Sequence, residues 1–277
     1  MRTQQQRLVT FASRLAAIIL IVFSLLVTRG VQPLRAQGGS CSDTVKLALQ
    51  AALQVCSGIQ RNQACYGNPA AEASPKAGAS INFSAPGNTA SLTDIASLRL
   101  SGYRSDTGTM GVALLQVPGG AAGTNVGSSV TVIVFGNTQI AGAPGQQSMQ
   151  AFYLRNGAAA PGCEQVAADG IMIQTPAGQQ RVQLTVNGTQ LSIGSTVFLS
   201  ARPNPDDESK AALNIQTLEG EVTVEADGET IEVPAGAQTN VPLAEVNGEY
   251  EVDGEPEALE SLDQDLFDDL PLDELPD

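Results

Sequence analysis

Apolar and polar residues alternate through much of the second half of the chain, in short runs separated by turn residues. Residues 182–193 alternate on both sides of Asn187-Gly188, and residues 222–233 alternate on both sides of Asp227-Gly228. A period of two is typical of strands with one buried face. An Asn-Gly or Asp-Gly pair between two such runs favours a hairpin with a type I′ turn, because both turn residues need positive φ. The pattern therefore predicts two β-hairpins.

These two hairpins lie within an internal repeat. Residues 173–199 and 215–243 both begin with Ile-Gln-Thr, and their turn pairs and apolar positions align. A weaker third instance surrounds Asn247-Gly248. Two copies and a fragment are too few for a solenoid. We therefore predict a mainly β fold, a β-sandwich or β-roll in which stacked hairpins bury each other's apolar faces.

The first half of the chain combines one helical pattern with further strands. Between Ser42 and Cys56 the apolar residues recur at helical spacing, and Ser42 or Asp43 is the expected N-cap. The predicted apolar face of this helix consists of Val45, Leu49, Ala52, Leu53 and Cys56. Residues 111–117 and 129–136 are predicted strands. The glycine-rich loop between them matches neither a dinucleotide nor a phosphate-binding motif.

The N-terminus is typical of an exported protein. Arginines without acidic residues precede an apolar run at 15–27, and thirteen residues are fewer than the roughly 20 that a membrane span needs. We predict a signal peptide over residues 1–36, with cleavage after Ala36 and an extracytoplasmic location, secreted or in the cell envelope. An uncleaved N-terminal anchor is the alternative.

The four cysteines agree with export. Cys41, Cys56, Cys65 and Cys163 form no C-x-x-C pair, so a zinc or thioredoxin-type site is disfavoured, and two disulfides are expected outside the cytosol. A continuous helix would place Cys41 and Cys56 about 22 Å apart. A disulfide needs Cα atoms within about 7 Å, which excludes that pairing and leaves the other two open.

Charge divides the chain at its last quarter. Residues 37–205 carry a net charge of +2, whereas residues 206–277 hold twenty-three acidic residues and one lysine, Lys210. Nucleic acid is therefore a poor partner. We predict that residues 244–277 form an acidic disordered tail, because its composition offers little apolar surface to bury. The tail acids Asp263, Asp265, Asp268 and Asp269 lack the pattern of a calcium loop.

One segment resembles a known family. The runs LEGEVTV, IEV and PAGAQTNV in the second copy, with TPAG and VNGTQLSIG in the first, resemble the FecR-type domain over about residues 170–243. The resemblance implies an extracytoplasmic, β-rich domain that relays signals from an outer-membrane receptor to a sigma factor in its best-known members. Those members carry a cytoplasmic anti-sigma region, for which the roughly fourteen residues ahead of the apolar run leave no room. Residues 41–68 are similar to the start of a group of secreted bacterial proteins with no known activity.

Candidate catalytic chemistry is sparse. The chain has no histidine, which removes Ser-His-Asp and Cys-His nucleophile pairs and most catalytic zinc sites. Asp106 lies in Asp-Thr-Gly-Thr, the tetrapeptide of aspartic proteases, but no second copy supplies the partner carboxylate. The sequons at Asn82 and Asn187 are expected to be incidental.

Together these observations predict four parts: a signal peptide (1–36), a cysteine-bearing helix with strands (37–160), a FecR-like β domain (161–243) and an acidic tail (244–277). The predicted function is non-catalytic binding of an envelope protein or a wall polymer. We assign no catalytic, cofactor-binding or metal-binding residue and expect no cofactor. Membrane contact is expected only through an uncleaved N-terminus. The alternatives are an envelope signal sensor anchored by that segment and an aspartic-type protease.

Overall fold

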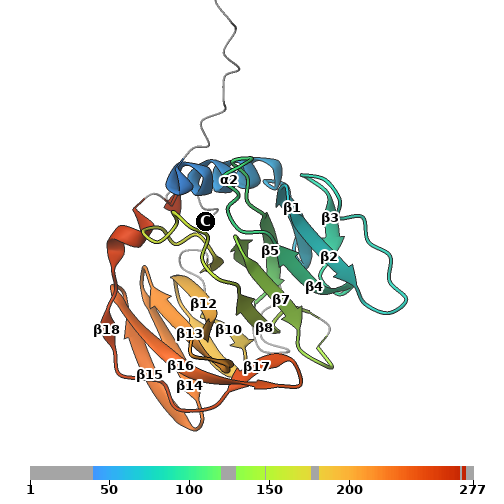
Figure 1. Cartoon of the computed structure of the whole chain (residues 1–277). Coiled ribbons are helices and arrows are strands. Elements are labelled where there is room, and N and C mark those ends of the chain that lie inside the picture. The colour runs from blue at the N-terminus through green and yellow to red at the C-terminus, as the bar shows by residue number, and fades with distance from the viewer. Residues whose placement is uncertain (1–39, 120–128, 147, 176–180, 269, 273–277) are drawn as a thin grey trace, which may run out of the picture. The chain divides into compact units, whose positions relative to one another are not determined.

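The part of the chain that the structure describes folds into two β-sheets that pack face to face, with a third, partial layer over one of them (Figure 1). The computed structural model describes residues 40–119, 129–146, 148–175, 181–268 and 270–272. All of these belong to one compact unit. The predicted signal peptide lies outside the described residues. Among those that are described, no helix is long and apolar enough to cross a membrane.

The larger sheet has ten strands in the order β17-β16-β13-β12-β9-β6-β5-β1-β3, with β18 pairing beside β16. Every pair in it is antiparallel. In chain order the strands are β1 (Gln63–Asn68), β3 (Thr89–Ser91), β5 (Val112–Pro118), β6 (Ser129–Phe135), β9 (Gly170–Gln174), β12 (Thr196–Asn204), β13 (Asp207–Thr217), β16 (Ala237–Val246), β17 (Glu249–Val252) and β18 (Glu260–Ser261).

The smaller sheet has eight strands in the order β15-β14-β11-β10-β8-β7-β4-β2. Its strands are β2 (Ala71–Pro75), β4 (Ile95–Leu100), β7 (Thr138–Gly142), β8 (Ala151–Asn156), β10 (Val182–Val186), β11 (Thr189–Ile193), β14 (Glu221–Ala226) and β15 (Glu229–Pro234). The pair of β8 and β10 is parallel, and the others are antiparallel. The predicted mainly β sandwich is therefore confirmed.

The predicted hairpins are present, each with the expected turn. Asn187 and Gly188 have φ of 53° and 85° between β10 and β11, and Asp227 and Gly228 have 50° and 86° between β14 and β15. The third instance, at Asn247-Gly248, joins β16 to β17. Buried residues alternate with exposed ones along β14, as its sequence predicts. The two repeat copies lie side by side, because β11 pairs with β14.

The main core lies between the two sheets, and a second apolar cluster lies on the outer face of the larger sheet. Helix α2 (Cys41–Val55) covers that outer face over β1 and β5, burying Val45, Leu49 and Ala52. The second cluster also contains Ile133 and Phe135, which explains why β6 is buried almost continuously rather than alternately. The N-cap is Ser40, not Ser42 or Asp43: its hydroxyl accepts from the Asp43 N–H at 3.1 Å.

The predicted boundary at residue 160 does not divide the molecule. Strand β6 pairs with β9 in the larger sheet, and β8 pairs with β10 in the smaller one, so both sheets run across the boundary. Residues assigned to separate domains therefore share one core. Period-two patterns identify strands but contain no information on which strands pair over long distances.

The prediction that residues 244–277 are disordered is wrong for those that the structure describes. Residues 244–246 continue β16, β17 follows, and a 3-10 helix, η1 (Gln264–Phe267), lies beside the sheet. Tyr250, Leu262, Phe267 and Leu270 are all buried. The tail orders because its few apolar side chains meet a surface already formed by the rest of the fold, and because its backbone pairs with β16.

Candidate functional site

A groove of about 470 Å³ crosses the outer face of the larger sheet, over β12, β13 and β16. The loop between β8 and β9 supplies one wall, and the C-terminal segment around η1 supplies the other. The floor consists of the outward-facing side chains of the three strands: Phe198, Ser200, Arg202, Ala212, Asn214, Gln216, Gln238 and Asn240. Inward-facing residues of the same strands, such as Leu199, Leu213 and Val241, lie in the main core.

Strand register places the floor amides in two parallel rows. Asn214 pairs with Asn240, and its Nδ2 donates to the Asn240 Oδ1 at 2.9 Å. Gln216 pairs with Gln238, and its Nε2 donates to the Gln238 Oε1 at 2.9 Å. We call these the asparagine row and the glutamine row. Each row continues onto β12, where Ser200 lies opposite Asn214 and Phe198 lies opposite Gln216.

Two glutamates set the direction of the rows. Asn240 Nδ2 donates to Glu257 Oε2 at 3.1 Å, and Gln238 Nε2 donates to Glu260 Oε2 at 3.4 Å. In both bonds the amide turns its NH2 group towards the glutamate, whose carboxylate oxygen accepts. The carbonyl oxygens of Asn214 and Gln216 therefore face away from the glutamates, towards β12. Gln216 is 9% exposed, and its Oε1 is buried with no donor among the described residues.

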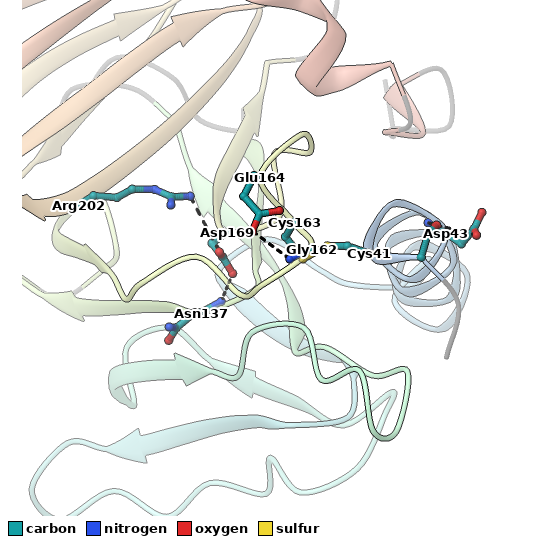
Figure 2. Close-up of a disulfide and its surroundings, with 9 residues drawn as sticks. Cys41, Asp43, Asn137, Gly162, Cys163, Glu164, Asp169 and Arg202 are labelled. Atoms are coloured by element: carbon teal, nitrogen blue, oxygen red, sulfur yellow. Dashed lines mark hydrogen bonds and ion pairs between the residues drawn. A yellow bond between two sulfur atoms is a disulfide. The ribbon is translucent and has the colours of Figure 1, made fainter. Parts of the chain in front are cut away.

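A buried carboxylate lies beside the arginine of the groove (Figure 2). Asp169 is 1% exposed; its Oδ1 accepts from the Asn137 N–H at 2.6 Å, and its Oδ2 is 3.9 Å from the Arg202 Nη2. Burial raises the pKa of Asp169, while the Asn137 N–H and the Arg202 charge act in the opposite direction. Within the described chain the Oδ2 atom has no hydrogen-bond donor. Asp169 thus forms an ion pair with Arg202 without a hydrogen bond.

The walls of the groove are held in place covalently and by packing. The Cys41–Cys163 disulfide joins the start of α2 to the loop between β8 and β9 (Figure 2). The Ala167 N–H donates to the Leu266 carbonyl at 2.9 Å and so joins the two walls. Phe267 packs edge-on against the floor residue Phe198, with ring centroids 5.4 Å apart. The shape of the groove is therefore built into the fold.

Charge in the groove is more negative than positive. The ionisable residues that line it are Glu164, Asp263 and Arg202. The Glu164 carboxylate folds back to accept the Gly162 N–H at 3.1 Å (Figure 2), and backbone hydrogen bonds lower its pKa. These hydrogen bonds favour the ionised form of Glu164, and two acidic side chains against one arginine disfavour an anionic ligand.

Three further hollows among the described residues have fewer fixed polar groups. One of about 330 Å³ lies over the outer face of the smaller sheet and is lined by exposed amides such as Gln183 and Gln190. A second, of about 360 Å³, lies around η1 and is lined mainly by leucines, and a third, of about 190 Å³, lies between Arg99 and Arg155. The groove differs from all three in its two hydrogen-bonded amide rows and its buried, unpartnered acceptors.

The cysteines form two disulfides, Cys41–Cys163 and Cys56–Cys65. Helix length excludes the pairing of Cys41 with Cys56, and the structure agrees, because the two lie at opposite ends of α2 and each is bonded elsewhere. Of the two arrangements left open, the fold selects the one in which the first bridge reaches the groove wall and the second joins α2 to β1. Two disulfides are typical of proteins that fold in an oxidising environment outside the cytosol.

Other sequence candidates lie apart from the groove. Asp106 is at an exposed turn closed by the Arg104–Thr109 bridge, and it pairs with Arg104 at 3.1 Å, which lowers its pKa. It therefore lies in the expected turn. Asn187 is fully buried, which leaves no room for a glycan at that sequon. Asp263 accepts from the Asp265 N–H at the start of η1, and no acidic cluster among the described residues is arranged to hold a metal.

The groove itself was not found from the sequence. Its signal was the pair of alternating amides, Asn214-x-Gln216 and Gln238-x-Asn240, on strands whose other face is apolar. Polar residues at every second position also describe an ordinary solvated strand face. Only the pairing of β13 with β16 and the position of the tail show that these amides line a groove.

Comparisons with protein-family models, with curated proteins and with solved structures find no match.

Proposed function

We propose that this chain is a non-catalytic binding protein of the secreted or cell-envelope compartment, and that the groove over β12, β13 and β16 is its ligand site. The proposal rests on the arrangement of side chains inside the groove. The floor has hydrogen-bonded amide rows, a buried carboxylate lies behind Arg202, and a disulfide holds one wall in place. Concave sites with a few placed polar groups are the usual form of ligand sites.

Its composition supports binding rather than catalysis. The polar residues that line the groove are amides, a serine, two acids and one arginine, and the chain has no histidine to move protons near neutral pH. Such groups form many moderate hydrogen bonds, which suit recognition of a polar polymer or protein surface. The partner is thus an envelope protein or a wall polymer, and the FecR-like resemblance of residues 170–243 belongs to the same proposal.

Cosedimentation of the purified mature chain with isolated cell-wall polymer and with envelope membranes tests this function. We expect the chain to pellet with one fraction and to release no soluble product from it. Ala212→Trp, which puts a large side chain on the groove floor, should abolish pelleting. Ala151→Trp, in the hollow of the smaller sheet, is the matched control and should leave it unchanged. Release of cleavage products, or no pelleting with either fraction, would contradict the proposal.

A further inference from the structure

We propose that the ligand of the groove is an uncharged, hydroxyl-rich glycan segment. This inference rests on the proposed function and names its ligand class. It follows from which hydrogen-bonding capacity of the floor is already used and which is left for a ligand.

The two rows use half of their amide N–H groups inside the protein. Asn214, Gln216, Asn240 and Gln238 each have two side-chain N–H groups and each donate one hydrogen bond to a neighbouring amide or glutamate. The side-chain carbonyl oxygens of Asn214 and Gln216 accept no hydrogen bond from within the rows, and the buried Oε1 of Gln216 has no partner in the described chain. Leaving a buried acceptor unpaired is costly, so a ligand that brings a hydrogen-bond donor to this point gains affinity.

The same floor also offers donors at its β12 side. Arg202 is about half-exposed and its nearest carboxylate oxygen is 3.9 Å away, which leaves guanidinium N–H groups for a ligand. The Ser200 hydroxyl can donate or accept. A ligand must therefore donate to the amide carbonyls and accept from Arg202 within one short stretch. Adjacent hydroxyl groups of a sugar do both, because each hydroxyl is donor and acceptor.

The spacing of the polar groups on the groove floor and the charges around them restrict the class of ligand further. Residues two apart on a strand are about 6.7 Å apart and neighbouring strands about 4.8 Å apart, so the rows form a two-dimensional grid of polar groups. An extended peptide instead needs donors and acceptors that alternate along one line, as at a sheet edge. Glu164 and Asp263 disfavour an anionic polymer, and Arg202 disfavours a cationic one at the β12 side. An uncharged glycan fits both the grid and the charges.

The test uses the oxidised mature chain and a panel of soluble probes: cellotetraose, maltotetraose and N-acetylated chitotetraose as neutral glycans, tetragalacturonate as an anion, deacetylated chitotetraose as a cation, and tetra-alanine as a peptide. Titration is followed by calorimetry and by the side-chain amide NMR signals of asparagine and glutamine. We expect at least one neutral glycan to bind and to shift the Gln216 and Asn214 side-chain signals, with the charged probes and the peptide weaker by about tenfold or more.

Gln216→Met removes the unpartnered oxygen at nearly constant volume and should weaken binding of the neutral glycan by about tenfold. Gln190→Met removes an exposed amide from the smaller sheet and should leave it unchanged. Both variants must keep the wild-type unfolding midpoint within error. If Gln216→Met does not, the test rests on whether a neutral glycan shifts the Gln216 and Asn214 side-chain NMR signals of the wild-type protein.

Binding of tetra-alanine or of a charged probe in preference to every neutral glycan would overturn the inference, as would the absence of binding by any neutral glycan at millimolar concentration. Neither result would by itself overturn the proposed function, which fails only if the chain does not bind wall polymer or envelope membranes, or if it cleaves them.

Discussion

The two disulfides close loops of very different length, which leads to a quantitative prediction about stability. Cys41–Cys163 spans 122 residues and Cys56–Cys65 spans 9. In the chain-entropy account, a cross-link stabilises by restricting the unfolded chain, and the effect grows with the logarithm of the loop length. The long bridge is then worth about 5 kcal/mol and the short one about 2.5 kcal/mol. All four cysteines are buried, so alanine is a suitable replacement.

Guanidinium unfolding of the oxidised double variants measures this difference. Cys41→Ala with Cys163→Ala should lower the free energy of unfolding by about twice as much as Cys56→Ala with Cys65→Ala. The first variant also releases one groove wall from α2, so it should weaken ligand binding as well. Equal losses, or a larger loss for the short bridge, would refute the entropic reasoning and would show that local packing around α2 dominates.

Three further predictions concern the turn, the buried acid and the tail. Asn187→Ala should lower the free energy of unfolding by about 3 kcal/mol, because this buried residue has positive φ and makes three hydrogen bonds to backbone groups. Asn247→Ala, in the exposed equivalent turn, should lower it by about 1 kcal/mol. Thermal or denaturant unfolding measures both changes. Asp169 has a raised pKa, so the folded state binds its proton more tightly than the unfolded state. Its contribution to the free energy of unfolding must therefore decline as pH rises from the ordinary pKa of 3.8 through the raised pKa. The difference in free energy of unfolding between the wild type and Asp169→Asn should fall over the same pH range. A difference that grows with pH would contradict the effect of burial on this pKa. Phe267→Ala should remove hydrogen-exchange protection from residues 262–268 while the central strands keep theirs; unchanged protection there would mean that the contact with Phe198 does not hold the tail.

Local features of the fold could be predicted from the sequence because their causes are local. The Asn-Gly and Asp-Gly pairs determine hairpin turns through backbone sterics, and alternation determines which strand face is buried. The helix at α2 and the exclusion of Cys41–Cys56 likewise follow from geometry within fifteen residues. These predictions are confirmed.

What the sequence did not predict depends on contacts between distant segments. The tail is ordered because Phe267 and Leu262 meet a surface made by β12 and the loop before β9, and composition alone contains no information about that surface. Likewise, Asn214 and Asn240 become neighbours only through the register of β13 and β16. The remaining disulfide choice also required the position of the loop that carries Cys163.

Hydrogen–deuterium exchange of the mature chain, alone and saturated with the wall or envelope fraction that pellets it, tests the central claim most directly. The account predicts that protection on binding is confined to β12, β13, β16 and the two groove walls, with the polymer recovered intact. Protection centred on the smaller sheet with none at the groove, or polymer recovered in fragments, would contradict it.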